Sequence, residues 1–454
     1  MMRLVLLCWL VAASACASVP ERKVDLPMPE AYDFAREAAA RAETDAQWWR
    51  EFEDGALNAL TEEALAANQD IAAGLAAVKT ARASVSIANA TLFPQLGASA
   101  SAGSDTKGLD DISASARASA FYQLDLFGRN GANRAAAKAA YDAQKFDQRA
   151  LELTVASDVA FTYFSILAAR ERLAVARSNL EISERIFGIV ETKYRAGAVS
   201  GFDVASQEAA RANARARLPQ VAQQLTSLET ALAVLLGKPS QGYSAPEGAL
   251  LSTEPPPINS GLPSDLLLRR PDLLSAQAQL RVAGADVAAA KAAFLPTIDL
   301  GAGVSAALTG GTSAIGSLAA SLSAPIFSGG RLEGGLAGAK AREDQQVARF
   351  RQAVLIALRE VDVSLSALAT AEEREQQLAA ANDAAAKSLS LAEILYRAGR
   401  DDLTSLLTAQ QTAFNAADAL AQGRLDRLSA AIDLYVAIGG GWMEGSTRAG
   451  AAAP

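Results

Sequence analysis

Hydrophobic residues recur at seven-residue intervals along two long stretches, from about Asn130 to Arg195 and from about Arg331 to Arg397. In the first stretch one line consists of large residues: Val159, Ile166, Leu173, Leu180, Phe187 and Tyr194. A neighbouring line is mostly small: Thr162, Ala169, Ala176, Ser183 and Val190. Neither stretch contains Pro, and a 3.5-residue period is typical of coiled-coil packing. We therefore expect two helices, each about 100 Å long at 1.5 Å per residue.

The second stretch repeats the first at an offset of about 202 residues. The offset carries the line of large residues onto Val361, Leu368, Glu375, Asn382, Leu389 and Tyr396, so that only Glu375 and Asn382 break the pattern. Pro94 corresponds to Pro296 within similar segments, and the sequence Tyr-Arg-Ala-Gly at 194–197 recurs at 396–399. Matches in the same order indicate a duplicated unit of about 200 residues.

Each repeat has the same predicted order of elements. A helix, at 55–90 and again at 264–293, is followed by two alternating Ser/Ala/Gly-rich runs that predict a β-hairpin. The predicted strands are 96–103 and 113–127 in the first repeat, and 298–308 and 317–327 in the second. The long helix and one more helix complete the unit.

The predicted organisation has six parts. They are a signal peptide at 1–15, a lipid anchor and tether at 16–52, the first repeat at 53–245, a Pro-rich linker at 246–263, the second repeat at 264–440 and a tail at 441–454. The fold class is mainly α with a β part, built from two internal repeats.

Composition excludes several functions. The chain of 454 residues has no His, which removes Ser/His/Asp triads and zinc helices of the HExxH type. A formal net charge of −8 argues against nucleic-acid binding, which needs a basic face. No phosphate-binding loop or cluster of metal ligands occurs in a matching context. We therefore expect no enzyme activity, no cofactor and no metal.

The N-terminus predicts export. Arg3 precedes an apolar stretch of about ten residues, which is too short to span a bilayer. Ala13-Ser14-Ala15-Cys16 resembles the lipobox of bacterial lipoproteins, although Ala13 stands where Leu is usual. The alternative is an ordinary cleavage site followed by an incidental Cys. We expect Cys16 to be lipidated, because a lone thiol in an exported chain otherwise lacks an explanation.

Across nearly the whole mature length, the chain resembles the TolC family of outer-membrane efflux channels, particularly its OprM/NodT-type lipoproteins. The resemblance is carried by 268–273 (LRRPDL), 292–298 (AAFLPTI), 324–330 (APIFSGG) and the two Tyr-x-x-Gly motifs. It implies a homotrimer in which each subunit gives four strands to one transmembrane β-barrel and its helices to a periplasmic coiled-coil barrel. It also implies a periplasmic adaptor protein and an inner-membrane RND-type transporter as partners. Physical chemistry independently supports an oligomer. The four strands of one chain cannot close a barrel in lipid, where every strand edge must be paired.

The Tyr-x-x-Gly motifs are candidate contact sites at the ends of the long helices. Gly197 and Gly399 suit a left-handed residue after a helix, and Ser200 with Asp203 suits the start of the next one. The resemblance implies that these tips, with Tyr194 and Tyr396, also meet the adaptor.

Candidate residues for the tunnel entrance follow the second motif. In the family, Asp residues on the last helix often narrow the entrance, and the corresponding positions here are Ser405 and Thr408. The acids nearby are Asp401 and Asp402, and Asp203 is the equivalent candidate in the first repeat. Asp402 and Asp203 can instead be helix caps. Arg269, Arg270 and Asp272 around Pro271 are interpreted as helix-start chemistry.

The sequence thus predicts a passive exit duct in the outer membrane of a Gram-negative bacterium, lipid-anchored and extending into the periplasm. The alternative is an exported coiled-coil stalk or adhesin that transports nothing. The hairpins favour the duct, because a stalk has no use for strands long enough to cross a bilayer. An exported hydrolase using carboxylates ranks last, because no paired-acid motif supports it.

Overall fold

The computed structural model describes residues 22, 24–26, 28–34, 47–104, 112–248, 250, 254–258, 261–308 and 313–441. The predicted signal peptide and Cys16 lie outside the described residues, as does nearly all of the predicted tail. The chain divides into two compact units. The strand unit comprises Met1–Pro27, Gly74–Gln148 and Pro271–Val354, and the helix unit comprises Met28–Ala73, Arg149–Arg270 and Leu355–Pro454. Each unit draws on both repeats.

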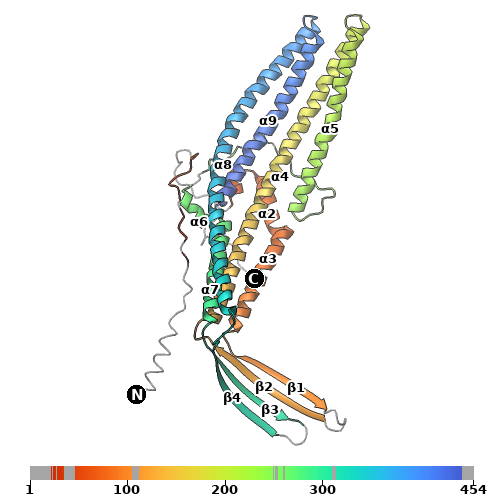
Figure 1. The fold of residues 1–454 in the computed structure, drawn as a ribbon. Helices are drawn as coiled ribbons and strands as arrows, with labels where there is room; N and C mark the ends of the chain where they lie inside the picture. The colour runs from red at the N-terminus through yellow and green to blue at the C-terminus, as the bar shows by residue number, and fades with distance from the viewer. Residues whose placement is uncertain are drawn as a thin grey trace. The chain divides into compact units, whose positions relative to one another are not determined.

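The strand unit contains one antiparallel sheet in the order β1-β2-β3-β4 (Figure 1). Its strands are β1 (Gln95–Ser104), β2 (Ile112–Leu124), β3 (Thr297–Ala307) and β4 (Ser313–Ser323). The two predicted hairpins are therefore present, and β2 pairs with β3 to join them, with Ala118 opposite Val304. In contrast to the prediction, β4 starts earlier and ends before Pro325, which has no N–H to give to a ladder.

The two long helices have the predicted extent. α4 spans Arg129–Arg195 and α8 spans Arg331–Arg397, 67 residues each. Their first parts belong to the strand unit and the remainder to the helix unit.

The prediction of single helices at 55–90 and 264–293 was wrong in one respect. Each of the two helices is interrupted in the structure. The first divides into α2 (Gly55–Ala67) and α3 (Gln69–Ala90) at Asn68, whose side-chain oxygen accepts the N–H groups of Asp70 and Ile71. The second divides into η3 (Pro263–Asp265), α6 (Leu266–Arg269) and α7 (Pro271–Ala292). Arg270 is extended there because the proline ring that follows disfavours helical backbone.

Within the helix unit, α5 (Gly201–Leu235) runs antiparallel to α4, and α9 (Leu403–Ala437) runs antiparallel to α8 (Figure 1). A short helix, η1 (Trp48–Phe52), brings an aromatic cluster to the other end of α9. Trp48 stacks on Tyr435 with ring centroids 5.2 Å apart, and the Tyr435 hydroxyl hydrogen-bonds Glu51. This cluster packs η1 against the C-terminal end of α9.

The positions of the seven-residue pattern are occupied differently in the two long helices. On α4 the line of small residues is buried, including Ala169, Ala176 and Ser183. On α8 the polar exception Glu375 accepts ion pairs from α9, at 3.6 Å from Arg424 and 2.9 Å from Arg427. The polar position in the α8 line is thus occupied by a charge that pairs with the neighbouring helix. The predicted fold class, mainly helical with four strands and two repeats, is confirmed.

Candidate functional site

The sheet has one apolar and one polar face. Strand residues alternate between faces, and residues paired across strands share one. The register pairs even-numbered residues with even-numbered ones throughout. The apolar face therefore carries the even-numbered residues, which are hydrophobic or Gly apart from Ser104 and Tyr122. Its large members include Leu96, Ile298, Leu300, Val304, Leu318 and Leu322. Leu318 and Leu96 are 88% and 84% exposed, so within one chain this face is left uncovered.

The polar face carries the odd-numbered residues and is lined mostly by Ser, Thr, Gln and Gly. Ser101 and Ser115 hydrogen-bond each other across β1 and β2 at 3.0 Å. Near the other end of β2, Gln123 donates to Asp299 at 3.0 Å. Phe121 and Ile315 are the only large apolar residues on this face in the described strands. One sheet surface thus suits hydrocarbon and the other suits water.

Both edges of the sheet lack a partner strand in the described chain. β1 pairs only with β2, and β4 pairs only with β3. Each edge therefore presents backbone N–H and C=O groups that would have to be paired in a membrane.

The ends of the long helices have the predicted turn geometry. Gly197 and Gly399 have φ values of 75° and 70°, in the left-handed region that favours glycine. In each turn the residue after the glycine donates its N–H back across the turn: Ala198 to the Lys193 carbonyl and Arg400 to the Leu395 carbonyl, both at 2.9 Å. The two tips are thus built alike at the backbone.

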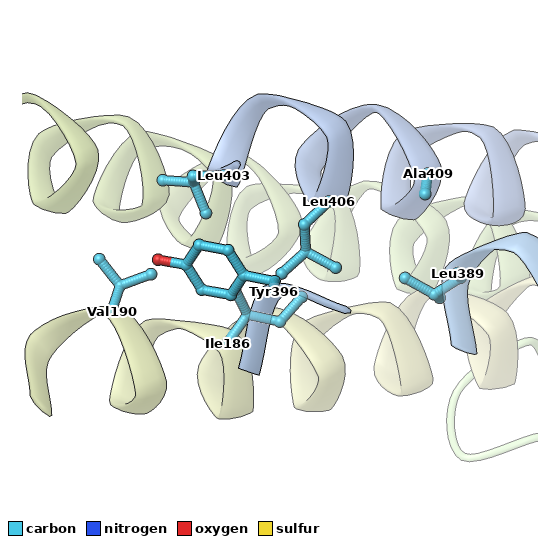
Figure 2. Packing of buried hydrophobic residues seen from close by; sticks show 7 residues of the cluster. All are labelled: Ile186, Val190, Leu389, Tyr396, Leu403, Leu406 and Ala409. Carbon is cyan, nitrogen blue, oxygen red and sulfur yellow. The ribbon is translucent and has the colours of Figure 1, made fainter. Parts of the chain in front are cut away.

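The two tip tyrosines differ, which their identical motifs do not show. Tyr194 is 50% exposed, whereas Tyr396 is 2% exposed. Tyr396 belongs to a buried tip cluster of Ile186, Val190, Leu389, Tyr396, Leu403, Leu406 and Ala409. Figure 2 shows the Tyr396 ring at its centre, between side chains of α4 and α9. Burial and the nearby Asp203 carboxylate raise the pKa of Tyr396. Tyr396 therefore holds the tip together, and Tyr194 is available to a partner.

Polar contacts also join α4 to α8 beside the tip cluster. The Arg185 guanidinium makes two hydrogen bonds to the Glu393 carboxylate, at 3.0 and 3.1 Å. Arg185, together with Arg397, lowers the pKa of Glu393. Lys193 bonds the Tyr396 carbonyl and lies 4.2 Å from the centroid of that ring. The two long helices are thus tied by charge as well as by packing.

Two of the three candidate entrance acids, Asp203 and Asp402, cap helices. Asp203 accepts the Ser200 N–H at 2.8 Å in a reciprocal capping box. Asp402 accepts the Ser405 N–H at 2.8 Å and caps α9, and this hydrogen bond lowers the pKa of Asp402. Asp401 accepts the Asp402 N–H at 2.9 Å. The structure therefore brings Asp401, Asp402 and Ser405 together at one helix start.

Thr408 lies one turn further on and lines a groove of about 750 Å³ between α5 and α9. Most of the lining is polar, and it includes Gln410, which donates to Asn179 at 3.1 Å. The Thr408 hydroxyl itself bonds the Thr404 carbonyl at 2.8 Å. Sequence reasoning missed this groove, because its amides are scattered over three helices and have no common spacing.

Within the part of the chain that the structure describes, no group of three or more His, Cys, Asp or Glu side chains could hold a metal. Two described helices, α3 and α4, contain a window apolar enough for a membrane span by length and composition. The window is 56% buried in α4 and 6% buried in α3, and one or two such helices are weak evidence of a membrane span. The membrane-compatible surface that the register defines is instead the apolar face of the sheet.

Comparisons with known proteins agree with this geometry. The sequence model of the family described as outer membrane efflux protein matches residues 60–238 and 262–440, one match per repeat. The pyoverdine export outer membrane protein OpmQ of Pseudomonas aeruginosa is 34% identical, with 94% of each chain covered. The outer membrane protein OprJ of the same organism is 33% identical, over 95% of this chain and 94% of OprJ.

Solved structures show the same fold. A membrane protein from Pseudomonas aeruginosa superposes with a TM-score of 0.84 at 30% identity, covering 93% of this chain and all of the other. The outer-membrane channel OprN superposes with a TM-score of 0.83 at 27% identity, covering 94% and 99%. With both repeats matched and the four-stranded sheet in place, the chain belongs to the outer membrane efflux protein family.

Proposed function

We propose that three copies of the chain close a β-barrel in the outer membrane and form the passive exit duct of a tripartite efflux pump. The observation that carries the proposal is the sheet, with an apolar face, a polar face and two unpaired edges. A barrel removes the edges by pairing β4 of one chain with β1 of the next. Because the strands alternate in direction, that junction is antiparallel like the other pairings.

The two faces fix which side of the sheet meets lipid. Turning the polar face outward would place Arg117 in hydrocarbon, at a cost of about 2–4 kcal/mol near the bilayer midplane. It would also expose Asp299 and many Ser hydroxyls. The apolar face therefore meets lipid, and the polar face lines a water-filled lumen.

In this proposal the helices of the three chains form a tunnel in the periplasm. Their tips, at Tyr194, Gly197, Tyr396 and Gly399, meet a periplasmic adaptor protein. An RND-type transporter in the inner membrane supplies the energy. The exposure of Tyr194 supports contact at the first tip, because a free ring is a good interface anchor. Ser405, Thr408, Asp401, Asp402 and Asp203 remain candidates for lining the tunnel entrance.

Lipidation of Cys16 would anchor each subunit by its N-terminus. The mass of the mature protein should exceed that of the polypeptide by its acyl groups. In Cys16→Ser the excess mass should disappear, while trimers should still form if the barrel carries the assembly. A wild-type mass equal to the bare polypeptide would refute the anchor alone.

The main test is the oligomeric state and its consequence in cells. Protein extracted from outer membranes in detergent should have the mass of three chains by native mass spectrometry. Deleting the gene should increase sensitivity to at least one exported compound. A monomer recovered from the soluble periplasmic fraction would overturn the duct and favour a stalk.

Contact with the adaptor has its own test. Tyr194→Ala should reduce efflux and crosslinking to the adaptor, with trimers unchanged. Phe202→Ala is the matched control, because Phe202 is also an exposed aromatic, 77% accessible, but lies outside the turn motif. Equal efflux in Tyr194→Ala and the wild type would refute adaptor contact at this residue.

A further inference from the structure

The four strands carry two charged residues per chain, Arg117 on β2 and Asp299 on β3. Both have odd numbers and so lie on the polar face. In register, Arg117 faces Ser99 on one side and Ser305 on the other. On its own strand the next residues on the same face are Ser115 and Ser119. The guanidinium thus stands among short hydroxyl side chains that cannot cover it.

The two charges differ in their surroundings. Asp299 accepts a hydrogen bond from Gln123, whose own oxygen accepts one from Asn130 at 3.4 Å. Arg117 is exposed, and no ion pair or hydrogen bond joins its side chain to another residue in the described strands and helices. Its charge is therefore free to act on a solute.

We propose that Arg117 forms a positive ring in the lumen of the barrel, which attracts negatively charged solutes and sets a preference for anions at that level. This inference rests on the proposed function, because three chains are needed to make the ring. The substrate class it favours is small solutes that carry a carboxylate, sulfate or phosphate group.

The expected dimensions of the barrel allow the electric field of the three Arg117 guanidinium groups to extend across the lumen. Twelve strands spaced by about 4.8 Å and tilted by about 40° close into a cylinder of roughly 12 Å radius. Ser and Gly side chains take up little of it. The space that remains is comparable to the Debye length, about 8 Å at physiological ionic strength. A solute anywhere in this cross-section therefore experiences the guanidinium charges.

Asp299 does not cancel this ring. Along β3, Asp299 lies six residues from Ser305, the residue paired with Arg117. At about 3.3 Å per residue the two positions are roughly 20 Å apart along the strand. A strand tilt of about 40° puts their levels roughly 15 Å apart along the barrel axis, about twice the Debye length. The two rings should therefore act separately and with opposite sign.

The test is the reversal potential of purified trimers in planar bilayers under a tenfold KCl gradient. The chloride-to-potassium permeability ratio should fall at least about twofold in Arg117→Gln and further in Arg117→Glu. Arg117→Lys should keep the wild-type ratio, and Asp299→Asn should raise it. Ser99→Gln adds bulk beside Arg117 without charge, and should leave the ratio unchanged.

The outcomes separate the inference from the proposed function. Trimers that conduct with the same ratio in Arg117→Glu and the wild type would overturn the positive ring and leave the duct standing. A wild type that forms no trimer or no conducting pore would overturn the duct, and the ring with it.

Discussion

Residues that look alike in the sequence have different roles in the structure. Tyr194 and Tyr396 occupy equivalent positions in the two repeats, yet one is exposed and the other is buried in the tip cluster. A repeat preserves the backbone turn, which needs only a glycine of positive φ, but not the neighbours that α9 brings to the second tip. Asp402 was open to two interpretations in the sequence, and the structure gives it a cap contact.

Two substitutions of Asp402 distinguish a role in capping α9 from an electrostatic role at the tunnel entrance. Asn caps helices as well as Asp does but carries no charge. If capping is its role, Asp402→Asn should keep the melting temperature of the purified protein and its ion selectivity, whereas Asp402→Ala should lower the melting temperature. The measurements are thermal unfolding and reversal potential. A change of selectivity in Asp402→Asn would instead make this carboxylate part of the entrance.

Because of the Arg185–Glu393 ion pair, we expect the stability of the helix tip to depend on pH. The folded-state pKa of Glu393 is lowered, so the pair stabilises the tip above the unfolded pKa of about 4.3, and this stabilisation is lost as pH falls through the folded value. Arg185 is half exposed, so the contribution should be about 1 kcal/mol or less.

Hydrogen exchange of the tip amides measures this effect. Glu393→Gln should exchange up to about fivefold faster than the wild type at pH 7, because 1 kcal/mol corresponds to that ratio. Below the folded pKa the difference should vanish. Glu373→Gln, on the same helix, is the control. If Glu393→Gln still exchanged faster than the wild type by the same factor at low pH, the stabilising role of the Arg185–Glu393 ion pair would be contradicted.

At the scale of elements, the sequence predicted what depends on periodicity and missed what depends on one side chain. The long helices were placed to within a residue because a seven-residue pattern without Pro has one reading. The break at Asn68 was missed, because a single capping amide is weak evidence within an apolar helical run. The start of β4 was missed because Ser313 to Gly316 alternate only weakly in polarity. The faces of the sheet required the register, which the sequence does not contain.

Substituting alanine for glycines at helix ends should destabilise the protein to different degrees. A Cβ at Gly439 would lie 2.7 Å from the Arg269 carbonyl oxygen, and φ there is 93°. At Gly399 a Cβ would meet nothing within 4 Å, so only the left-handed backbone, about 1–2 kcal/mol, opposes it.

Thermal unfolding should therefore rank three variants. Gly439→Ala should lower the melting temperature most, and Gly399→Ala moderately. Gly338→Ala, inside α8, where a Cβ would meet only the end of the Arg342 side chain at 4.0 Å, should raise it slightly, because Ala is the better helix former by about 1 kcal/mol. Equal effects at Gly439 and Gly399 would mean that the close approach to Arg269 is absent.

At the scale of the whole molecule, one chain is an incomplete object. The apolar face is uncovered and both sheet edges are open within the described chain. In the proposed trimer, three copies remove both features and also bring Arg117 into a ring. On this proposal, membrane insertion, edge pairing and ion selectivity all follow from one assembly step.

Cysteine crosslinking of the sheet edges tests that step most directly. A cysteine at Ala100 on β1 is combined, one variant at a time, with a cysteine at Ala314, Gly316, Leu318, Ala320 or Leu322 on β4, all on the apolar face. Variants with only one of the two introduced cysteines are the control, because the chain also contains Cys8 and Cys16. The account predicts that oxidation in membranes gives, for at least one pair, a covalent species of three chains. Only monomers with every pair, from membranes that contain the protein, would contradict the closed barrel.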